Sequence, residues 1–261
     1  MRTIFYFIIT FNFLFQSLFA ANSSPIFGKN GMIVSTSEQA SQAGIDILKK
    51  GGNAVDAAVA VGFALAVTSS GNGNLGGGGF MVGVMENGER FTLDHREKAP
   101  ESAHRDMFIN DSGNVISGMS LYSRASSGVP GTVDGLIRAL NDYGSGNISL
   151  RQVLAPAIEL ADKGFNLSHY EARRFNAYKE FFKKNDAADE VFNRKDHKPW
   201  KKGDRFVQKD LAKTLKRIAK FGRDGFYSGV VADLIVKEMK RGNGLITHKD
   251  LNKYQSVYRE P

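Results

Sequence analysis

The stretch from Ala54 to Val67 restricts the possible folds more than any other part of the chain. It reads AVDAAVAVGFALAV, and its only charged residue is Asp56. A helix that is apolar on all sides has to be buried, because it has no polar face to turn toward water. It is also too short to cross a bilayer, which takes about 20 residues. The sequence therefore predicts a fold in which other elements cover this helix on every side.

A β-hairpin is predicted downstream of this helix. Asn87-Gly88 lies between two runs of strand-forming residues, 80–85 and 91–95, and an Asn-Gly pair in that position is a strong hairpin signal. A two-residue loop places Phe80 opposite His95 and Gly79 opposite Arg96. In this register a core face is predicted to contain Phe80, Val82, Val84, Phe91, Leu93 and His95. The other face is predicted to contain Gly79, Met81, Gly83, Thr92, Asp94 and Arg96.

Arg96 is the candidate ligand-binding residue. A glycine opposite Arg96 would leave open space beside the guanidinium, whose planar set of donors fits a carboxylate. The structural alternative is an ion pair with Asp94 or Glu97, which is the usual role of an arginine near carboxylates. His95, on the core face, is interpreted as a buried structural histidine. The spacing of the histidines indicates no metal site, and no nucleophile and base stand at a recognisable spacing.

The amino terminus has the pattern of a secretory signal peptide. One positive charge, Arg2, precedes an apolar run that ends at Phe19, and the small residues Ala20 and Ala21 follow. Cleavage after Ala20 is predicted, and retention as a membrane anchor is the alternative.

Residues 1–20 are thus assigned to the signal, 21–28 to a linker and 29–261 to a single, incomplete domain. Loss of Arg2 lowers the net charge from +8 to +7. The chain has no cysteine, so neither disulfides nor thiolate metal sites contribute, and stability has to come from packing.

Capping residues and apolar periodicity predict the other elements. A buried strand is expected at 31–34, and Ser35 with Glu38 forms a capping box for a helix that ends near Lys50. Asn53 is the expected cap of the apolar helix. Further helices are predicted at 132–143 with Thr132 as the cap, and at 150–162, 168–184, 208–221 and 227–241, followed by a strand that starts within 254–261.

Two features of the sequence suggest a dinucleotide or a nucleic acid as ligand, but their sequence context argues against both. Residues 71–76 read GNGNLG, which matches the dinucleotide fingerprint, but a helix precedes the motif and a strand follows it, the reverse of what that fingerprint needs. Close approach of two backbones is therefore the preferred interpretation of the glycines.

Residues 173–223 contain 17 Lys or Arg against 7 Asp or Glu. Because these charges are scattered through helical patterns, they are interpreted as a solvated face, and no nucleic acid partner is expected.

Seven motifs taken together resemble the γ-glutamyltransferase family. They occur in this order between Gly31 and Pro261: GMIVST, GGNAVDAAVA, GNGNLGGGGFMVG, LDHREKAP, SGVPGTVDGL, VLAPAIELADKGF and YREP. The resemblance covers the amino-terminal part of the family's large subunit. It implies an α/β (α+β) chain with an incomplete N-terminal-nucleophile hydrolase fold, a four-layer αββα sandwich that is helix-rich in this portion.

The resemblance also implies a function. Members are secreted or membrane-tethered enzymes whose precursor cleaves itself, and the new amino-terminal threonine of the small subunit attacks the γ-glutamyl amide of glutathione. The acyl group then passes to water or to an amino acid. Implied ligands are glutathione or other γ-glutamyl compounds, and implied partners are the rest of the large subunit and the small subunit. No cofactor or metal is implied, and the location is periplasmic or secreted, without membrane attachment after signal removal.

Arg96 in LDHRE matches the family arginine that binds the α-carboxylate of the glutamyl group, whereas His95 stands where the family usually has phenylalanine. No threonine of this chain matches the nucleophile, so no catalytic residue is assigned and the isolated chain is expected to be inactive. Three interpretations stay open. The chain is part of a γ-glutamyl-transferring enzyme, shortened or split between two genes; or a non-catalytic, stand-alone protein; or part of a glutaryl or cephalosporin acylase of the same superfamily.

Overall fold

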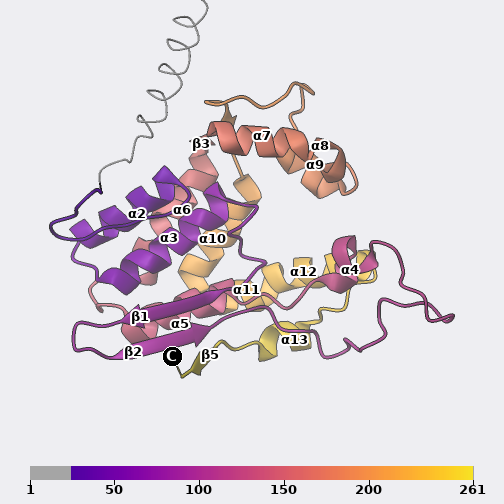
Figure 1. The fold of residues 1–261 in the computed structure, drawn as a ribbon, viewed down its shortest axis with the longest axis horizontal. Coiled ribbons are helices and arrows are strands. Elements are labelled where there is room, and N and C mark those ends of the chain that lie inside the picture. Colours follow the sequence, from indigo (N-terminus) through magenta and orange to yellow (C-terminus); the bar gives the residue numbers. More distant parts are fainter. Residues whose placement is uncertain (1–24, 261) are drawn as a thin grey trace, which may run out of the picture. The chain divides into compact units, whose positions relative to one another are not determined.

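The computed structural model describes residues 25–260, so the predicted signal peptide lies outside the described residues. The chain divides into two units between Met32 and Ile33. Residues 25–32 of the first unit contain no helix or strand. The second unit contains all the labelled elements of Figure 1. In the described part of the chain, no helix is both long and apolar enough to cross a membrane.

The second unit consists mainly of helices with short strands between them. The helices are α2 (Glu38–Lys49), α3 (Ala54–Thr68), α4 (Met119–Tyr122), η2 (Arg124–Ser126), α5 (Thr132–Tyr143), α6 (Leu150–Lys163), α7 (His169–Ala177), α8 (Lys179–Phe182), α9 (Asp186–Phe192), α10 (Lys209–Phe221), α11 (Asp224–Tyr227), α12 (Gly229–Arg241) and α13 (His248–Lys253). The strands are β1 (Phe80–Val84), β2 (Arg90–Asp94), β3 (Phe165–Asn166), β4 (Arg205–Phe206) and β5 (Val257–Arg259). The described strands form one antiparallel sheet in the order β1-β2-β5 and a separate pair, β3-β4.

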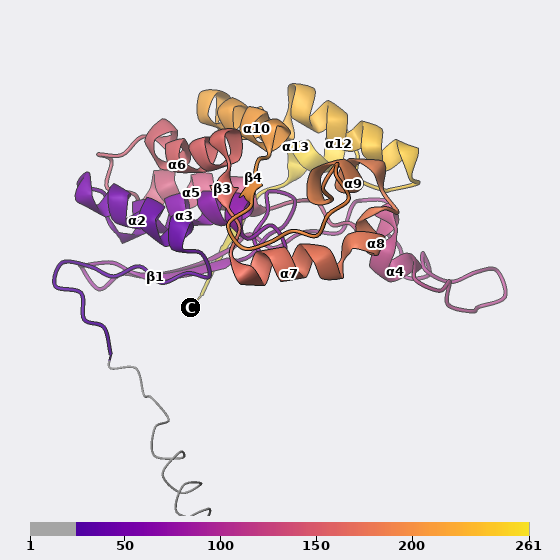
Figure 2. The same ribbon diagram turned by 90° about the horizontal axis from the view of Figure 1, so that it is seen from above.

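Helix α3 is the centre of the core, as its composition predicts. Helices α2, α5 and α6 pack against it, and Figures 1 and 2 show this group of helices on one side of the β1-β2-β5 sheet. Asn53 caps α3 as expected: its side chain accepts from the amides of Val55 and Asp56, and the Asp56 carboxylate accepts from the amide of Asn53. Asp56 is fully buried and also accepts from the amide of Ser145, which ties the start of α3 to the end of α5.

The hairpin is present, but its register differs from the predicted one by one residue. Phe80 pairs with Asp94 rather than His95, and Gly79 lies opposite His95. The loop contains three residues instead of two, because Met85 already bonds to Glu89 and Gly88 takes a left-handed φ of 84°. Three-residue loops of this kind place glycine in the left-handed position and shift the pairing.

This one-residue shift in register exchanges the inward and outward faces of β1, whereas the faces of β2 are as predicted. Phe91, Leu93 and His95 are buried, whereas Phe80, Val82 and Val84 point outward and are 63, 71 and 68% exposed. The inward side of β1 carries Gly83, where an added Cβ would collide with the Phe91 ring. The sheet thus turns its β2 side chains to the helices and presents an apolar row on its outer face.

Several predicted boundaries were wrong for local reasons. Residues 31–34 form no strand, and Val34 is 84% exposed. Ser37 rather than Ser35 caps α2, because its hydroxyl accepts from the amide of Ala40. Helix α5 begins at Thr132, with Gly131 as its cap. The helix predicted at 168–184 is interrupted at Tyr178. The helices predicted at 150–162, 208–221 and 227–241 are confirmed within two residues, and β5 lies inside the predicted segment 254–261.

The exposed β1 row should dominate the surface behaviour of the chain. Val82→Thr is expected to reduce the fluorescence of an apolar dye and to slow aggregation of the purified chain, while the unfolding temperature changes little, because the side chain has few contacts to lose. Leu93→Thr, on the buried side of the neighbouring strand, is the matched control and should destabilise the fold by about 2 kcal/mol or more. Equal dye binding before and after Val82→Thr would show that the row is covered in solution.

Candidate functional site

The candidate site forms where two stretches of main chain come unusually close. Gly78 lies against residues 95–97, and a Cβ added to it would sit 2.5 Å from the carbonyl oxygen of His95 and 2.7 Å from the amide nitrogen of Glu97. Only glycine permits this approach. The preferred interpretation of the glycine run is therefore confirmed: α3 precedes it, β1 follows it, and the glycines serve backbone contact.

The amino end of α5 closes the same site from a third direction. The amides of Gly131 and Thr132 both donate to the carbonyl of Gly77, at 2.8 and 3.0 Å. Lys98 exchanges two backbone hydrogen bonds with Val129. The glycine run and the segment before α5 thus hold the chain on both sides of Arg96.

The main chain of Arg96 has a hydrogen-bond partner at each end. Its amide donates to Oδ1 of Asp94 at 3.0 Å, and its carbonyl accepts from the hydroxyl of Tyr254 at 2.8 Å. Oδ2 of Asp94 accepts from Nε of Arg259 at 2.6 Å. The amide of Arg96 and the Arg259 guanidinium lower the pKa of the Asp94 carboxyl, so Asp94 stays charged at neutral pH. Asp94 is engaged by β5 and is not the ion-pair partner of Arg96.

The side chain of Arg96 lies on the outer face of the sheet. Its Nε is 3.2 Å from Oε2 of Glu97, its guanidinium lies 6.0 Å from the centre of the Phe80 ring, and the side chain is 56% exposed. Among the described residues the two Nη atoms make no hydrogen bond. Arg96 thus forms one of the two ion pairs considered as its structural role, the one with Glu97. The N–H groups on the outer edge of its guanidinium can still donate to a ligand.

His95 is a buried neighbour of the site, as its predicted position on the core face implies. It is 7% exposed, and its ring is so close to Gly79 and Gly135 that a Cβ on either glycine would meet it, at 3.1 and 2.3 Å. Nδ1 is buried and has no hydrogen-bond partner. Burial lowers the pKa of His95, and this effect outweighs the opposing effects of its own backbone and of the carboxylates of Asp94 and Glu97.

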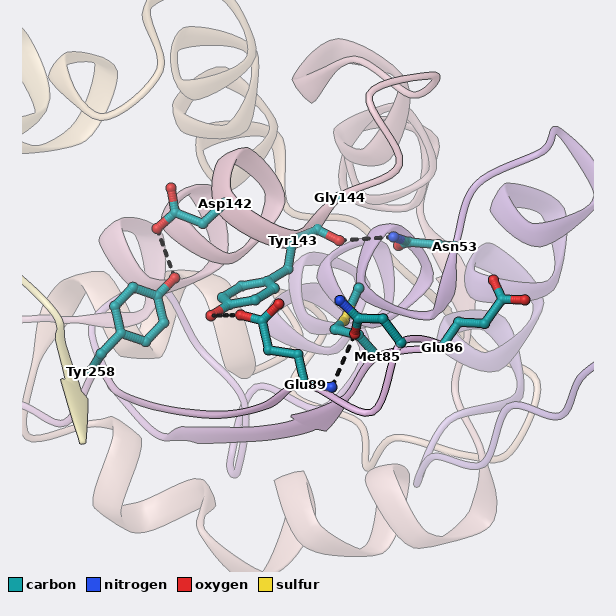
Figure 3. A pocket seen from close by; sticks show the side chains of 9 residues that line it. Asn53, Met85, Glu86, Glu89, Asp142, Tyr143, Gly144 and Tyr258 are labelled. Carbon is teal, nitrogen blue, oxygen red and sulfur yellow. Dashed lines mark hydrogen bonds between the residues drawn. The ribbon is translucent and has the colours of Figure 1, made fainter. Parts of the chain in front are cut away.

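A separate hollow of about 730 Å³ lies at the loop end of the hairpin (Figure 3), and Arg96 is not among the residues that line it. Its walls include the side chains of Glu89, Asp142, Tyr143 and Tyr258. The hydroxyls are already committed, Tyr143 to Glu89 at 3.2 Å and Tyr258 to Asp142 at 2.7 Å, and Tyr143 stacks on Phe91 at 4.0 Å. This arrangement joins the hairpin loop, α5 and β5. The residues that line the hollow include carboxylates but no serine, threonine or cysteine that could act as the nucleophile of an acyl transfer.

The sequence singles out Arg96 as a candidate but does not indicate the residues that hold it. Tyr254 and Arg259 lie more than 150 positions away in the chain, and no local pattern links them to LDHRE. The only available signal was their place in the terminal segment predicted to be a strand. Among the described residues, no group of three or more histidine, cysteine, aspartate or glutamate side chains is placed to hold a metal ion.

Comparison with known proteins identifies the family. A family model described as γ-glutamyltranspeptidase matches residues 40–261. The chain belongs to the γ-glutamyltranspeptidase family. It is 47% identical over 237 residues to the glutathione hydrolase proenzyme of Escherichia coli (strain K12), which covers 91% of this chain and 40% of that relative. The chain therefore spans about two fifths of the length of such relatives, in their amino-terminal part.

Solved structures place the chain in the N-terminal-nucleophile hydrolase fold. The crystal structure of Helicobacter pylori γ-glutamyltranspeptidase matches with a TM-score of 0.88 and 45% identity, over 91% of this chain and 68% of that chain. A cephalosporin acylase from Bacillus halodurans matches with a TM-score of 0.77 and 27% identity, over 93% of this chain and 47% of that chain. The predicted α+β class and the family resemblance are both confirmed.

The buried His95 should make the fold sensitive to mild acid. A histidine whose pKa is lowered in the fold binds its proton more readily in the unfolded chain, so stability is complete above the ordinary pKa of 6.5 and is lost as the pH falls below it. His95→Phe should remove this slope, which is at most about 1.4 kcal/mol per pH unit.

Denaturant unfolding between pH 7.5 and 5 measures the effect. The exposed His104 is the control, and His104→Phe should leave the slope unchanged. Persistence of the slope in His95→Phe would assign the acid sensitivity to other groups, whereas the carboxyl of Asp94 contributes only at lower pH, because its pKa is lowered.

Proposed function

We propose that this chain is the amino-terminal portion of an exported γ-glutamyltransferase. The enzyme cleaves the γ-glutamyl amide of glutathione and related compounds and transfers the acyl group to water or to amino acids. In this proposal Arg96 binds the α-carboxylate of the glutamyl group. The observation that carries it is the state of Arg96: its main chain is held at both ends, and the outer edge of its guanidinium has no partner among the described residues.

The chemistry of the guanidinium supports this role. Glu97 forms an ion pair with Nε at 3.2 Å, and the Nη pair is left for an incoming carboxylate. Two parallel N–H···O bonds from a planar fork are a strong and directional way to bind a carboxylate. Arg96 can thus place the substrate, and it supplies no nucleophile.

The location of Arg96 fits a buried active site in the complete protein. Arg96 shares the outer face of the sheet with the exposed row of Phe80, Val82 and Val84. A layer covering this apolar row would also exclude water from the guanidinium, and charge-assisted hydrogen bonds are stronger in such a site. The family sandwich has a second sheet that would occupy this place. We infer that the remaining part of the enzyme and its small subunit provide that layer.

The acyl-transfer step needs groups that these residues do not supply. Three of the described threonines have structural roles: Thr68 donates to the carbonyl of Ala64, Thr214 donates to that of Asp210, and Thr247 caps α13. Acyl transfer requires a nucleophile, a base and donors for the oxyanion together. We infer that the nucleophile is the amino-terminal threonine of the small subunit, as in the family, after export and removal of residues 1–20.

Purified residues 21–261 are expected to show no turnover of γ-glutamyl-p-nitroanilide. Positioning by Arg96 cannot replace a covalent intermediate, which divides one difficult step into two easier ones. Release of p-nitroaniline at 410 nm is the measurement. Turnover that is abolished by changing one residue of this chain would contradict the prediction.

A second candidate function is favoured by the likeness to the cephalosporin acylase. A glutaryl group carries its carboxylate at the same distance from the scissile amide as a γ-glutamyl group does, and it lacks only the α-amino group. Arg96 would bind either one. Turnover of γ-glutamyl and glutaryl anilides by the complete enzyme separates the two functions. A stand-alone, non-catalytic protein is the remaining alternative, and a monomer that unfolds cooperatively without dye binding would favour it.

Arg96→Ala in the complete enzyme tests the binding role directly. The precursor is either the natural one or one completed with the carboxyl-terminal part of the Escherichia coli relative. Loss of one partner of a charged hydrogen-bonded pair costs about 2 to 5 kcal/mol, so kcat/KM should fall roughly thirtyfold or more. Arg96→Lys should not restore it, because an ammonium lacks the fork.

The matched substrate is the same anilide with its α-carboxylate amidated. Its kcat/KM should be low with the parent enzyme and should change little in the Arg96→Ala variant. An equal loss on both substrates, or a fall in melting temperature as the main effect, would make Arg96 a structural partner of Glu97.

A further inference from the structure

We propose that Tyr254 is the positioning residue for Arg96, and through it for the substrate carboxylate; this rests on the binding role proposed for Arg96. The hydroxyl of Tyr254 donates to the carbonyl oxygen of Arg96 at 2.8 Å. The peptide group that receives this bond joins Arg96 to Glu97. Both side chains of the guanidinium–carboxylate pair extend from this one peptide, so the bond restrains their relative placement.

Tyr254 is itself held firmly enough to act as a fixed donor. It is 2% exposed, and its ring stacks on that of Tyr227 with an angle of 7° between the planes. Lys98 lies 5.2 Å from the centre of the same ring and donates to the carbonyl of Gln255. Burial raises the pKa of Tyr254, so the hydroxyl keeps its proton and remains a donor throughout the physiological range.

A charged network fixes the backbone around Tyr254. The guanidinium of Arg223 donates to the carbonyl of Tyr254 and to Oδ1 of Asp134, and the other carboxylate oxygen accepts from the amide of Ser256. Arg223 also lies over the ring of Tyr227 at 4.5 Å. The segment between α13 and β5 is therefore attached to α5 and α11 independently of Arg96.

The fold makes specific room for the hydroxyl. A Cβ on Gly131 would lie 2.1 Å from the hydroxyl oxygen of Tyr254 and 2.0 Å from the carbonyl oxygen of His95. The absence of a side chain at Gly131 thus lets the phenol reach the end of β2. If Tyr254 served only to fill the core, the ring would be sufficient and the hydroxyl would not need this space.

Tyr254→Phe isolates the hydroxyl, because the stacked ring remains. A neutral hydrogen bond contributes about 0.5 to 1.5 kcal/mol, so KM for γ-glutamyl-p-nitroanilide should rise roughly two- to tenfold in the complete enzyme. The value of kcat should stay within about a factor of two, since Arg96 acts on binding. KM for the α-amidated anilide should not change. KM does not depend on the fraction of enzyme that is folded, so partial unfolding cannot hide or mimic the effect.

Tyr227→Phe is the matched control. It removes a hydroxyl from the other ring of the same stack, where it donates to the carbonyl of Pro130 at 2.8 Å and does not touch Arg96. It should lower the melting temperature at least as much as Tyr254→Phe does and leave the ratio of the two KM values unchanged.

The double variant decides whether Tyr254 acts through Arg96. Adding Tyr254→Phe to Arg96→Ala should have no further effect on KM, because the group being positioned is gone. A rise in KM for both substrates, or an effect that persists in the Arg96→Ala background, would overturn the inference. If Arg96→Ala reduces the turnover of both substrates equally, carboxylate binding by Arg96 is disproved. If Arg96→Ala distinguishes the substrates but Tyr254→Phe does not, only the positioning role of Tyr254 is disproved.

Discussion

Main-chain contact at the carboxyl end of β2 is the constraint on which the site depends. Gly78 and Gly131 approach residues 95–97 at distances that admit no Cβ, and the amides at the start of α5 bond to Gly77. Side chains in this place would force the segments apart and free the backbone of Arg96. The cost of fixing so many glycines is the loss of their large conformational freedom, and the buried helices α3 and α5 supply the packing that offsets it.

The register of the hairpin decides which side chains of the sheet face the helices and which face outward. Because neighbouring residues on a strand point to opposite faces, the buried positions of Phe91, Leu93 and His95 place Arg96 on the outer face. The same parity sends Phe80 outward, close enough for its ring to lie 6.0 Å from the guanidinium. The alternation of side chains along the strands thus gives the sheet two different faces. One packs against the helices and stabilises the fold, and the other is exposed and available to a ligand or a covering layer.

Local signals in the sequence predicted the parts of the fold that local physics determines. The cap at Asn53, the burial of α3, the extents of α6 and α10 and the position of His95 are all confirmed. The register of β1 was wrong because Asn-Gly suits both two- and three-residue loops, and in the observed register Gly83 leaves room for the Phe91 ring. The anchoring of Arg96 by Tyr254 and of Asp94 by Arg259 could not be predicted, since these contacts join segments far apart in the chain.

The pairing of charges at the end of β2 bears on which ligand the site suits. Asp94 is neutralised by Arg259 and Glu97 by Arg96, so the cluster has no net charge. Arg96 attracts a carboxylate, while the neighbouring carboxylate of Glu97 repels one at short range. A ligand with both a carboxylate and an adjacent ammonium satisfies the two groups together. Under the proposed function this favours a γ-glutamyl group over a glutaryl group, because only the former carries the ammonium that would offset the charge of Glu97.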